Sequence, residues 1–273
     1  MWQLQEIDHR FEHFHLSIPN LQGKSNETIG FVGPNGAGKT TTLRILMGLL
    51  IPDKGQVRLM HQSIPTTDPV YLQEVGYVGE NPGFFFQASV RWNLKAIASF
   101  FPNWDRTVEK ELIERLKIPT KPIVEKLSRG NLIKLSLLIA LAHHPHILIL
   151  DEPTAGLDPL VRQELISILK EFQSQTAFHL LFSSHIIEDI EDLAQRLVLI
   201  LNGKIVADIP CATYYTWENS ISPPPFSPVF QDDLTILLNE KQYQQLSMTD
   251  QKYAKLIDLK KLVIRLMRGE TDD

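Results

Sequence analysis

The sequence predicts an α/β fold built on a parallel β-sheet, with strands and helices that alternate over residues 1 to about 205. Short, wholly apolar runs such as Ile147–Leu150 and Leu197–Leu201 are typical of central parallel strands that are covered on both faces. Between such runs lie longer segments with apolar residues at helical spacing, for example Thr107–Leu116. Strands that are separated by helices imply right-handed crossovers between parallel neighbours.

Each expected element has a local signal. Pro52 stops the first helix because proline cannot continue a helical hydrogen-bond ladder, and Asp105 is a plausible cap for the helix that follows it. The segment Leu132–Ala142 is apolar nearly all round, which indicates a buried helix. The expected elements, in chain order, are the strand Thr28–Val32, the helix Thr41–Leu50, the strand Gln56–Met60, the helices Thr107–Leu116 and Leu132–Ala142, and the strands Ile147–Leu150, Phe178–Phe182 and Leu197–Leu201.

Composition narrows the class of protein. The 273 residues suit one large domain, or one domain with an appendage, and a net charge of -5 argues against a nucleic-acid partner. The single cysteine, Cys211, cannot form an internal disulfide, so we expect a reducing compartment and an inert thiol. No apolar run reaches the ~18 residues that span a bilayer, and the first ten residues lack the apolar core of a signal peptide. We therefore expect a soluble, cytoplasmic chain that reaches a membrane only through a partner.

The composition changes after Asp208, so we expect a main domain over residues 1–208 and a C-terminal extension over residues 209–273. The proline-rich segment Ser222–Pro228 predicts a linker or a surface crossing, since proline disrupts helices and central strands. Tyr253–Met267 has the spacing of an amphipathic helix, which makes the extension a helical tail. We expect that helix to pack on its own domain, with a partner surface as the alternative.

A glycine-rich segment between a strand and a helix predicts a phosphate site. It fits the pattern G-x-x-x-x-G-K-[ST] and is followed by Thr41; its residues are Gly33, Pro34, Asn35, Gly36, Ala37, Gly38, Lys39 and Thr40. The glycines let backbone N–H groups converge on phosphate oxygens where a side chain would block the approach. Lys39 supplies a charge for the outer phosphates, and the Thr40 hydroxyl is a candidate Mg²⁺ ligand. The segment therefore predicts nucleotide binding.

Two carboxylates follow the apolar strand Ile147–Leu150. The strand delivers them to the carboxyl edge of the sheet, where open α/β folds bind ligands. Asp151 is the candidate holder of Mg²⁺, directly or through water, and Glu152 is a candidate to orient or deprotonate an attacking water. A capping pair at a turn is the alternative interpretation, and the phosphate segment makes it the weaker one.

Three further motifs complete an ordered series: Leu127–Asn131 (LSRGN), Ala155–Pro159 (AGLDP) and Ser183–His185 (SSH). Together with GPNGAGKTT and ILILDEP, they make the chain resemble the ATP-binding subunit of ABC transporters over residues 1 to 208. On its own, Ser128 is also a natural helix N-cap, and His185 a structural histidine.

The resemblance implies a fold and a set of roles. The fold would be the ABC ATPase fold, a RecA-like P-loop core with a helical subdomain inserted at about residues 84–134. Two such domains would meet head to tail, with Ser128 and Gly130 of one chain covering the terminal phosphate held by the other. Asp158 would link the two sites, and His185 would contact the γ-phosphate. The chain would then need a second ATPase chain, identical or related.

The sequence departs from the family pattern in two places. In LSRGN, Arg129 replaces the first of two glycines and Asn131 replaces a glutamine, which could alter turnover. Glu80 stands where the family has glutamine, and a glutamate can still bind Mg²⁺. For the aromatic ring that stacks on adenine, Phe11 is the first choice and Phe14 the alternative.

The subclass follows from a second set of residues. Phe101–Asp105 and the Tyr77–Glu80 loop resemble subunits of ABC-2 type exporters, which pair with separate membrane-spanning proteins. The resemblance implies an Mg-dependent ATPase that binds ATP and powers export, attached peripherally to the cytoplasmic face of the cell membrane. In the family, the region of Phe84–Phe86 meets the membrane subunit, and a core role is the alternative. There are two alternative functions: a regulatory ABC subunit with low ATP turnover, and a soluble ABC ATPase that has no role in transport.

The remaining histidines give little functional signal. His143, His144 and His146 cluster around Pro145 without a nearby cysteine or carboxylate in the sequence, so we expect a solvent-facing turn.

Overall fold

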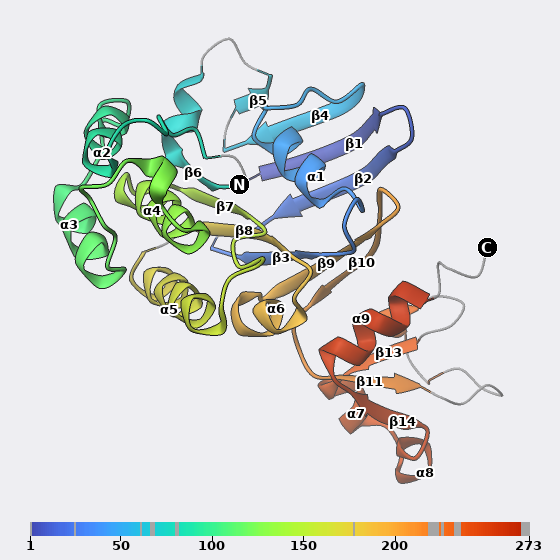
Figure 1. The fold of residues 1–273 in the computed structure, drawn as a ribbon. Coiled ribbons are helices and arrows are strands. Elements are labelled where there is room, and N and C mark those ends of the chain that lie inside the picture. The colour runs from blue at the N-terminus through green and yellow to red at the C-terminus, as the bar shows by residue number, and fades with distance from the viewer. Residues whose placement is uncertain are drawn as a thin grey trace.

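The computed structural model describes residues 2–24, 26–60, 62–65, 69–79, 82–176, 178–217, 224, 227–231 and 236–268. Within these ranges the chain forms a ten-stranded sheet and, near the C-terminus, a four-stranded sheet (Figure 1). The large sheet has the order β5-β4-β1-β2-β10-β9-β3-β8-β7-β6. Its strands are β1 (Trp2–Arg10), β2 (His15–Gly23), β3 (Thr28–Val32), β4 (Lys54–Leu59), β5 (Gln62–Ile64), β6 (Val75–Val78), β7 (Ile147–Asp151), β8 (His179–Ser184), β9 (Arg196–Leu201) and β10 (Lys204–Pro210).

The centre of the large sheet is parallel, as the apolar runs predicted. β6, β7, β8, β3 and β9 pair in parallel, and β10 then returns antiparallel to β9. Every residue of β3, β7 and β8 is buried, which explains why the middle of each strand is apolar on both faces rather than alternating. In the register, Asp151 lies opposite Ser183 and Val32 lies opposite Ser184, so the three strands end at one edge.

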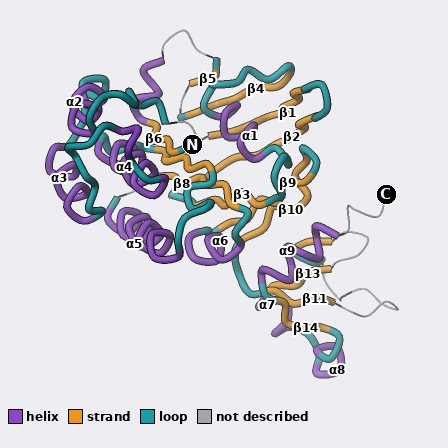
Figure 2. Tube along the Cα trace, in the orientation of Figure 1, coloured by secondary structure: helices purple, strands orange, loops and turns teal. Residues whose placement is uncertain are grey.

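Helices cover both faces of the parallel strands (Figures 1 and 2). Successive side chains of a strand point to opposite faces, so Leu148 and Leu150 enter one core and Ile147 and Ile149 enter the other. The first core includes residues of α4 (Arg129–Ala142), α5 (Pro159–Gln175) and α6 (Ile187–Leu193). The second includes residues of α1 (Lys39–Leu46) and of the antiparallel strands β1, β2 and β4. The first helix therefore starts at Lys39, two residues earlier than expected.

A group of helices lies beside the end of the sheet that carries β6 (Figure 1). It consists of α2 (Val90–Ala98), α3 (Arg106–Arg115) and the short 3₁₀ turn Val124–Lys126. Within this part of the fold, α3 packs against α4. A second 3₁₀ turn, Pro69–Glu74, precedes β6. Asp105 caps α3 as predicted, because its carboxylate accepts hydrogen bonds from the N–H groups of Thr107 and Val108 at 2.7 and 3.2 Å. Ser128 caps α4 in the same way, through the N–H of Asn131 at 3.3 Å.

The helical tail predicted for the C-terminal extension is only part of what the structure shows there. The described residues there include strands as well: β11 (Tyr214–Trp217), β12 (Phe230–Gln231), β13 (Ile236–Asn239), α7 (Glu240–Gln245), α8 (Met248–Gln251), β14 (Ala254–Ile257) and α9 (Leu259–Arg268). β14 occupies the first part of the expected helix and pairs antiparallel with β11. The helix begins only after Asp258, whose carboxylate accepts a hydrogen bond from the Lys261 N–H at 2.7 Å. Most of the expected linker Ser222–Pro228 lies outside the described residues.

The helix α9 packs on the main domain. This confirms the expectation that the amphipathic helix packs on its own domain rather than on a partner. Leu262, Val263 and Leu266 are buried in the same core as Ile190 of α6. At the edge of this contact, Lys260 donates a hydrogen bond to Glu188 of α6 at 3.0 Å. Among the described residues, none of the helices combines the length and apolar character needed to cross a bilayer.

The prediction of a solvent-facing histidine turn is wrong for His143. Its ring is buried and stacks on Phe101 with ring centroids 4.1 Å apart, and its Nδ1 lies 2.8 Å from the carbonyl oxygen of Ile139. Burial lowers the pKa of the His143 ring. His144 and His146 are exposed as expected. Burial also raises the pKa of the Cys211 thiol to about 12, in agreement with an inert cysteine.

The docking of α9 predicts a difference between two leucines of the C-terminal extension. Leu262 is 0% exposed, so Leu262→Ala should lower the free energy of unfolding by about 2–5 kcal/mol in urea denaturation. Leu256 is 68% exposed, and Leu256→Ala should stay within about 0.5 kcal/mol of the parent chain. Equal effects of the two substitutions would contradict the packing described here.

Candidate functional site

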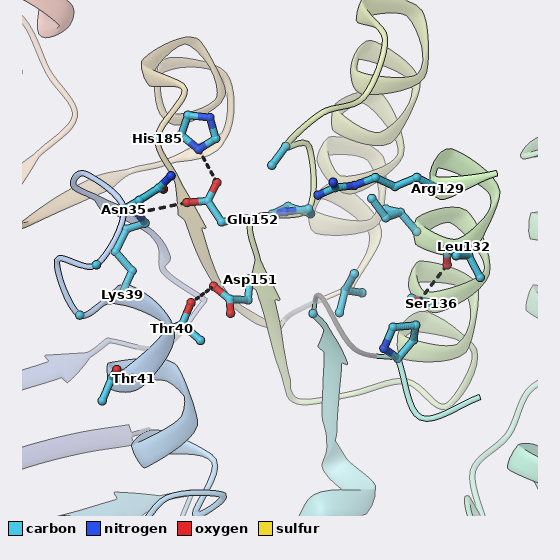
Figure 3. A pocket seen from close by; sticks show the side chains of 18 of the residues that line it. Asn35, Lys39, Thr40, Thr41, Arg129, Leu132, Ser136, Asp151, Glu152 and His185 are labelled. Carbon is cyan, nitrogen blue, oxygen red and sulfur yellow. Dashed lines mark hydrogen bonds and ion pairs between the residues drawn. The ribbon is translucent and has the colours of Figure 1, made fainter. Parts of the chain in front are cut away.

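A cavity of about 910 Å³ opens at the carboxyl edge of the parallel strands. It is lined by the turn between β1 and β2, the glycine-rich segment before α1, the ends of β6, β7 and β8, and the first turns of α4. Figure 3 shows Lys39, Thr40 and Thr41 on one side of this cavity and Arg129, Leu132 and Ser136 of α4 on the other. Asp151, Glu152 and His185 lie between them.

The glycine-rich segment folds into a tight turn that ends at the start of α1. Gly36 and Gly38 have φ angles of 79° and 112°, in the region that favours glycine. A side chain at Gly38 would also collide with Leu16 and Phe14, at 2.9 and 3.0 Å from its Cβ. No side chain caps α1, so the N–H groups of its first turn are available to an anion.

Lys39 is buried at the centre of this turn. Its Nζ donates hydrogen bonds to the carbonyl oxygens of Gly33 and Pro34, at 2.7 and 3.2 Å. It also lies 3.1 Å from Glu152 Oε1, as an ion pair without hydrogen-bond geometry. The ammonium group is thus held in place by backbone carbonyls and faces the cavity with a carboxylate beside it.

Asp151 connects the glycine-rich turn to β8. Its Oδ1 accepts a hydrogen bond from the Thr40 hydroxyl at 3.0 Å and another from the Ser183 hydroxyl at 2.7 Å. The Ser183 Oγ in turn accepts a hydrogen bond from the Glu152 N–H at 2.9 Å. Ser183 belongs to the SSH motif, but the motif alone does not predict these hydrogen bonds of its hydroxyl. The sequence shows only a polar residue at the end of an apolar strand, and its position opposite Asp151 emerges from the strand register of the structure.

Glu152 points away from Asp151, toward a different set of partners. Its Oε2 lies 2.7 Å from His185 Nδ1, and its Oε1 lies beside Lys39. The backbone of Glu152 has a φ of 51°, an uncommon value for a residue other than glycine. Such conformations persist only where the surroundings enforce them, and they cluster at functional sites.

Both candidate aromatic rings lie in the cavity wall. Phe11 and Phe14 line it with ring centroids 6.1 Å apart. Phe11 is 47% exposed, whereas Phe14 is partly buried and packs against the second core. Phe11 therefore offers the freer face to a ligand.

Other predicted site residues lie elsewhere in the chain. Ser128 and Asp158 cap α4 and α5, and Gly130 faces Val161 and Leu157. None of these three residues lines the described cavity, whereas Arg129, between Ser128 and Gly130, does. Glu80 lies outside the described residues. A site within one chain therefore contains the phosphate and acidic segments but not Ser128, Gly130 or Asp158.

The hydrogen bonds of Ser183 predict a measurable cost for removing its hydroxyl. Ser183 is 0% exposed, and Ser183→Ala should lower the free energy of unfolding by about 1–3 kcal/mol, because the Glu152 N–H and Asp151 each lose a buried partner. Ser174→Ala is the matched control, since the exposed Ser174 hydroxyl donates its hydrogen bond to Glu171 O within its own helix. Urea denaturation that gives the same value for both variants would contradict this role of Ser183.

Comparison with known proteins places the chain in a family. Residues 16–155, about half of the chain, match the family described as "ABC transporter". The bacitracin transport ATP-binding protein BcrA of Bacillus licheniformis is 35% identical over 70% of this chain and 63% of that protein. The chain thus spans less than two thirds of that relative. A Nod factor export ATP-binding protein I of Burkholderia pseudomallei is 35% identical over 75% of this chain and 69% of that protein.

Solved structures agree on the fold. The dimeric structure of the bacterial ABC transporter cassette MJ0796 has a TM-score of 0.69 with 19% identity, and covers 77% of this chain and 99% of that one. An ATP-binding subunit of an ABC transporter also has a TM-score of 0.69, with 21% identity over 77% of this chain and 90% of that one. The expected ABC ATPase fold is thereby confirmed. By its family match and its relatives, the chain belongs to the ABC transporter family.

Proposed function

We propose that this chain binds and hydrolyses ATP and thereby powers export through separate membrane-spanning subunits. The proposal rests mainly on one observation: a single cavity at the amino end of α1 is lined by Lys39, Asp151, Glu152 and His185. Each of these residues has a distinct task in phosphoryl transfer to water. The relative named for bacitracin transport supports a role in transport, and the relative named for Nod factor export supports its direction.

The phosphate groups of ATP fit the side of the cavity formed by the glycine-rich turn. The N–H groups at the start of α1 and the Lys39 ammonium would bind phosphate oxygens. A phosphate oxygen would then replace Glu152 Oε1 as the third partner of Lys39, and this exchange frees Glu152. The exposed ring of Phe11 would stack on the adenine, with Phe14 supporting the turn behind it.

The residues present fit a Mg²⁺ ion that is bound together with ATP. Thr40 and Asp151 offer a hydroxyl and a carboxylate oxygen 3.0 Å apart, both of the type that Mg²⁺ prefers. Within the described ranges, no group of three or more His, Cys, Asp or Glu side chains could hold a metal alone. That suits an ion whose other ligands are water and phosphate oxygens, and we propose Glu80 as a further ligand. When bound, the ion would neutralise charge on the β- and γ-phosphates.

Hydrolysis requires a base beside the γ-phosphate. Glu152 would orient a water molecule and accept its proton as the water oxygen attacks the γ-phosphorus and ADP leaves. His185 pairs with Glu152 at 2.7 Å and would hold that carboxylate in place while contacting the γ-phosphate. The uncommon positive φ of Glu152 fixes where this side chain leaves the backbone.

A second ATPase chain would complete each site. Ser128, Gly130 and Asp158 do not line the cavity of their own chain, and Ser128 is exposed at the amino end of α4. We propose that they cover the terminal phosphate bound by the other chain of a head-to-tail dimer, in which Asp158 links the two sites.

The membrane subunits would dock on the helical group around α2. Of the three consecutive phenylalanines, Phe84 packs against the core, whereas Phe85 and Phe86 are 57% and 43% exposed. Trp92 is exposed beside Phe85, with ring centroids 5.0 Å apart. Attachment through this aromatic surface would place the chain peripherally on the cytoplasmic face of the membrane.

Removing the proposed base should separate binding from hydrolysis. Glu152→Gln keeps the shape of the side chain but cannot accept a proton, so ATP hydrolysis should fall by about 100-fold or more. With Mg²⁺ and ATP, the variant should accumulate as a dimer in sedimentation velocity, because closure is no longer reversed by hydrolysis. Phosphate release and sedimentation together check this prediction.

Glu240→Gln is the control, since Glu240 lies in the C-terminal extension and binds the Tyr215 hydroxyl. It should hydrolyse ATP like the parent chain. Phosphate release by Glu152→Gln at the rate of this control would exclude Glu152 as the base.

A further inference from the structure

A buried carboxylate on α6 joins three separate segments next to the site. Asp189 is 1% exposed, and both of its oxygens are used. Oδ2 accepts a hydrogen bond from the Thr154 hydroxyl. It also shares the proton of the Ser184 hydroxyl, at 3.2 Å, with the carbonyl oxygen of Ile186, which lies at the same distance. Oδ1 accepts a hydrogen bond from Arg162 Nε at 2.6 Å, which is also an ion pair. Burying a charged group is costly unless it is paired and hydrogen-bonded, and Asp189 satisfies both conditions.

The partners of Asp189 are close neighbours of the site residues in the chain. Thr154 lies two residues after Glu152, and Ser184 directly precedes His185. Arg162 lies one turn into α5, and its N–H bonds to the carbonyl oxygen of Asp158. Asp189 itself does not line the cavity.

The segment from Glu152 to Leu157 depends on this anchor. It leaves the sheet at a residue with positive φ and continues through single turns, with bonds from Ala155 N to Glu152 O and from Leu157 N to Thr154 O, both 3.2 Å. Thr154 is 3% exposed, and the hydrogen bond of its hydroxyl to Asp189 ties this segment to α6. On the other side, the Ser184 hydroxyl accepts a hydrogen bond from Ile186 N at 3.0 Å, so it shapes the turn that carries His185.

We propose that Asp189 is a positioning residue for ATP hydrolysis. By fixing Thr154 and Ser184 relative to each other, it sets the separation at which Glu152 and His185 meet, and it does so without touching the nucleotide. The proposal rests on the proposed ATPase function and names a determinant of its turnover. A displacement of reacting groups by about 1 Å can cost about 100-fold in rate, so a small shift at this carboxylate is sufficient.

The test compares Asp189→Asn with Asp192→Asn on the same helix. Asp192 is exposed and pairs with Lys170 at 2.8 Å, so it reports what the loss of a surface carboxylate on α6 does. In Asp189→Asn, an NH₂ group replaces one carboxylate oxygen. This group must face either Arg162, which cannot accept a hydrogen bond, or the two hydroxyls that donate to the carboxylate in the parent chain, so at least one contact is lost. Thr154→Val is the second variant, because it removes one hydroxyl at nearly constant shape and leaves Asp189 in place.

The expected result is a loss of kcat with binding retained. Asp189→Asn and Thr154→Val should each lower kcat by about 10- to 100-fold, while the Kd for ATP, measured by calorimetry, stays within about twofold of the parent. The double variant should be no slower than the slower single variant, because Asp189→Asn already disrupts the Thr154–Asp189 hydrogen bond that Thr154→Val removes. Asp192→Asn should match the parent chain in both quantities.

Three results would overturn the proposal. The first is a kcat of Asp189→Asn and Thr154→Val equal to that of Asp192→Asn. The second is a parallel loss of ATP affinity and kcat in both variants, which would indicate general damage to the fold. The third is an additive loss in the double variant. A parent chain that binds ATP and never hydrolyses it would instead overturn the proposed function itself, and this positioning role with it.

Discussion

The parallel pairing of β7, β8 and β3 is the constraint on which the site depends. Parallel strands end at the same edge, and the register sets Asp151 opposite Ser183 and Val32 opposite Ser184. Three segments that are far apart in the sequence therefore start side by side: the glycine-rich turn, the segment after Glu152 and the turn that carries His185. The hydrogen bonds of Ser183 to Asp151 and from the Glu152 N–H then fix how the carboxylates emerge from this edge. A shift of one residue in this pairing would turn each of these side chains to the other face of the sheet.

The charges at this edge support the proposal that it binds a polyphosphate. Lys39 is a buried cation that is held by two backbone carbonyls and one carboxylate. The amino end of α1 adds partial positive charge at the same point, since no side chain caps it. Asp151 and Glu152 bring negative charge that would repel a polyphosphate without a cation between them. The positive φ of Glu152 turns the two carboxylates toward different partners. Nucleotide binding at this edge is thus expected to require a divalent cation beside Thr40 and Asp151, and to release Glu152 from Lys39.

Local patterns predicted the parts of the fold that local chemistry decides. The glycine-rich turn, the fully buried strands and the Asp105 cap each depend on a few neighbouring residues, and all three agree with the structure. His143 was misassigned because Phe101, which covers it, is remote in the sequence. The sequence places the start of the last helix at Tyr253, whereas the helix begins after Asp258. Leu256 and Ile257 fit a strand as well as a helix, and the cap that marks the start is Asp258. The roles of Ser183 and Asp189 could not be predicted from the sequence for a related reason. Their hydrogen-bond partners lie on other elements, and no residue spacing along the chain indicates these contacts.

The most direct test is calorimetric titration of ATP with Mg²⁺ into the parent chain, Lys39→Ala and Lys110→Ala. Lys110 is an exposed lysine of α3 and serves as the control. The parent and Lys110→Ala should bind one ATP per chain with equal affinity. Lys39→Ala should bind at least about 30-fold more weakly, since truncating one member of a buried charge pair costs about 2–5 kcal/mol. Equal affinity of Lys39→Ala and the parent would show that the nucleotide does not bind at the carboxyl edge of the sheet.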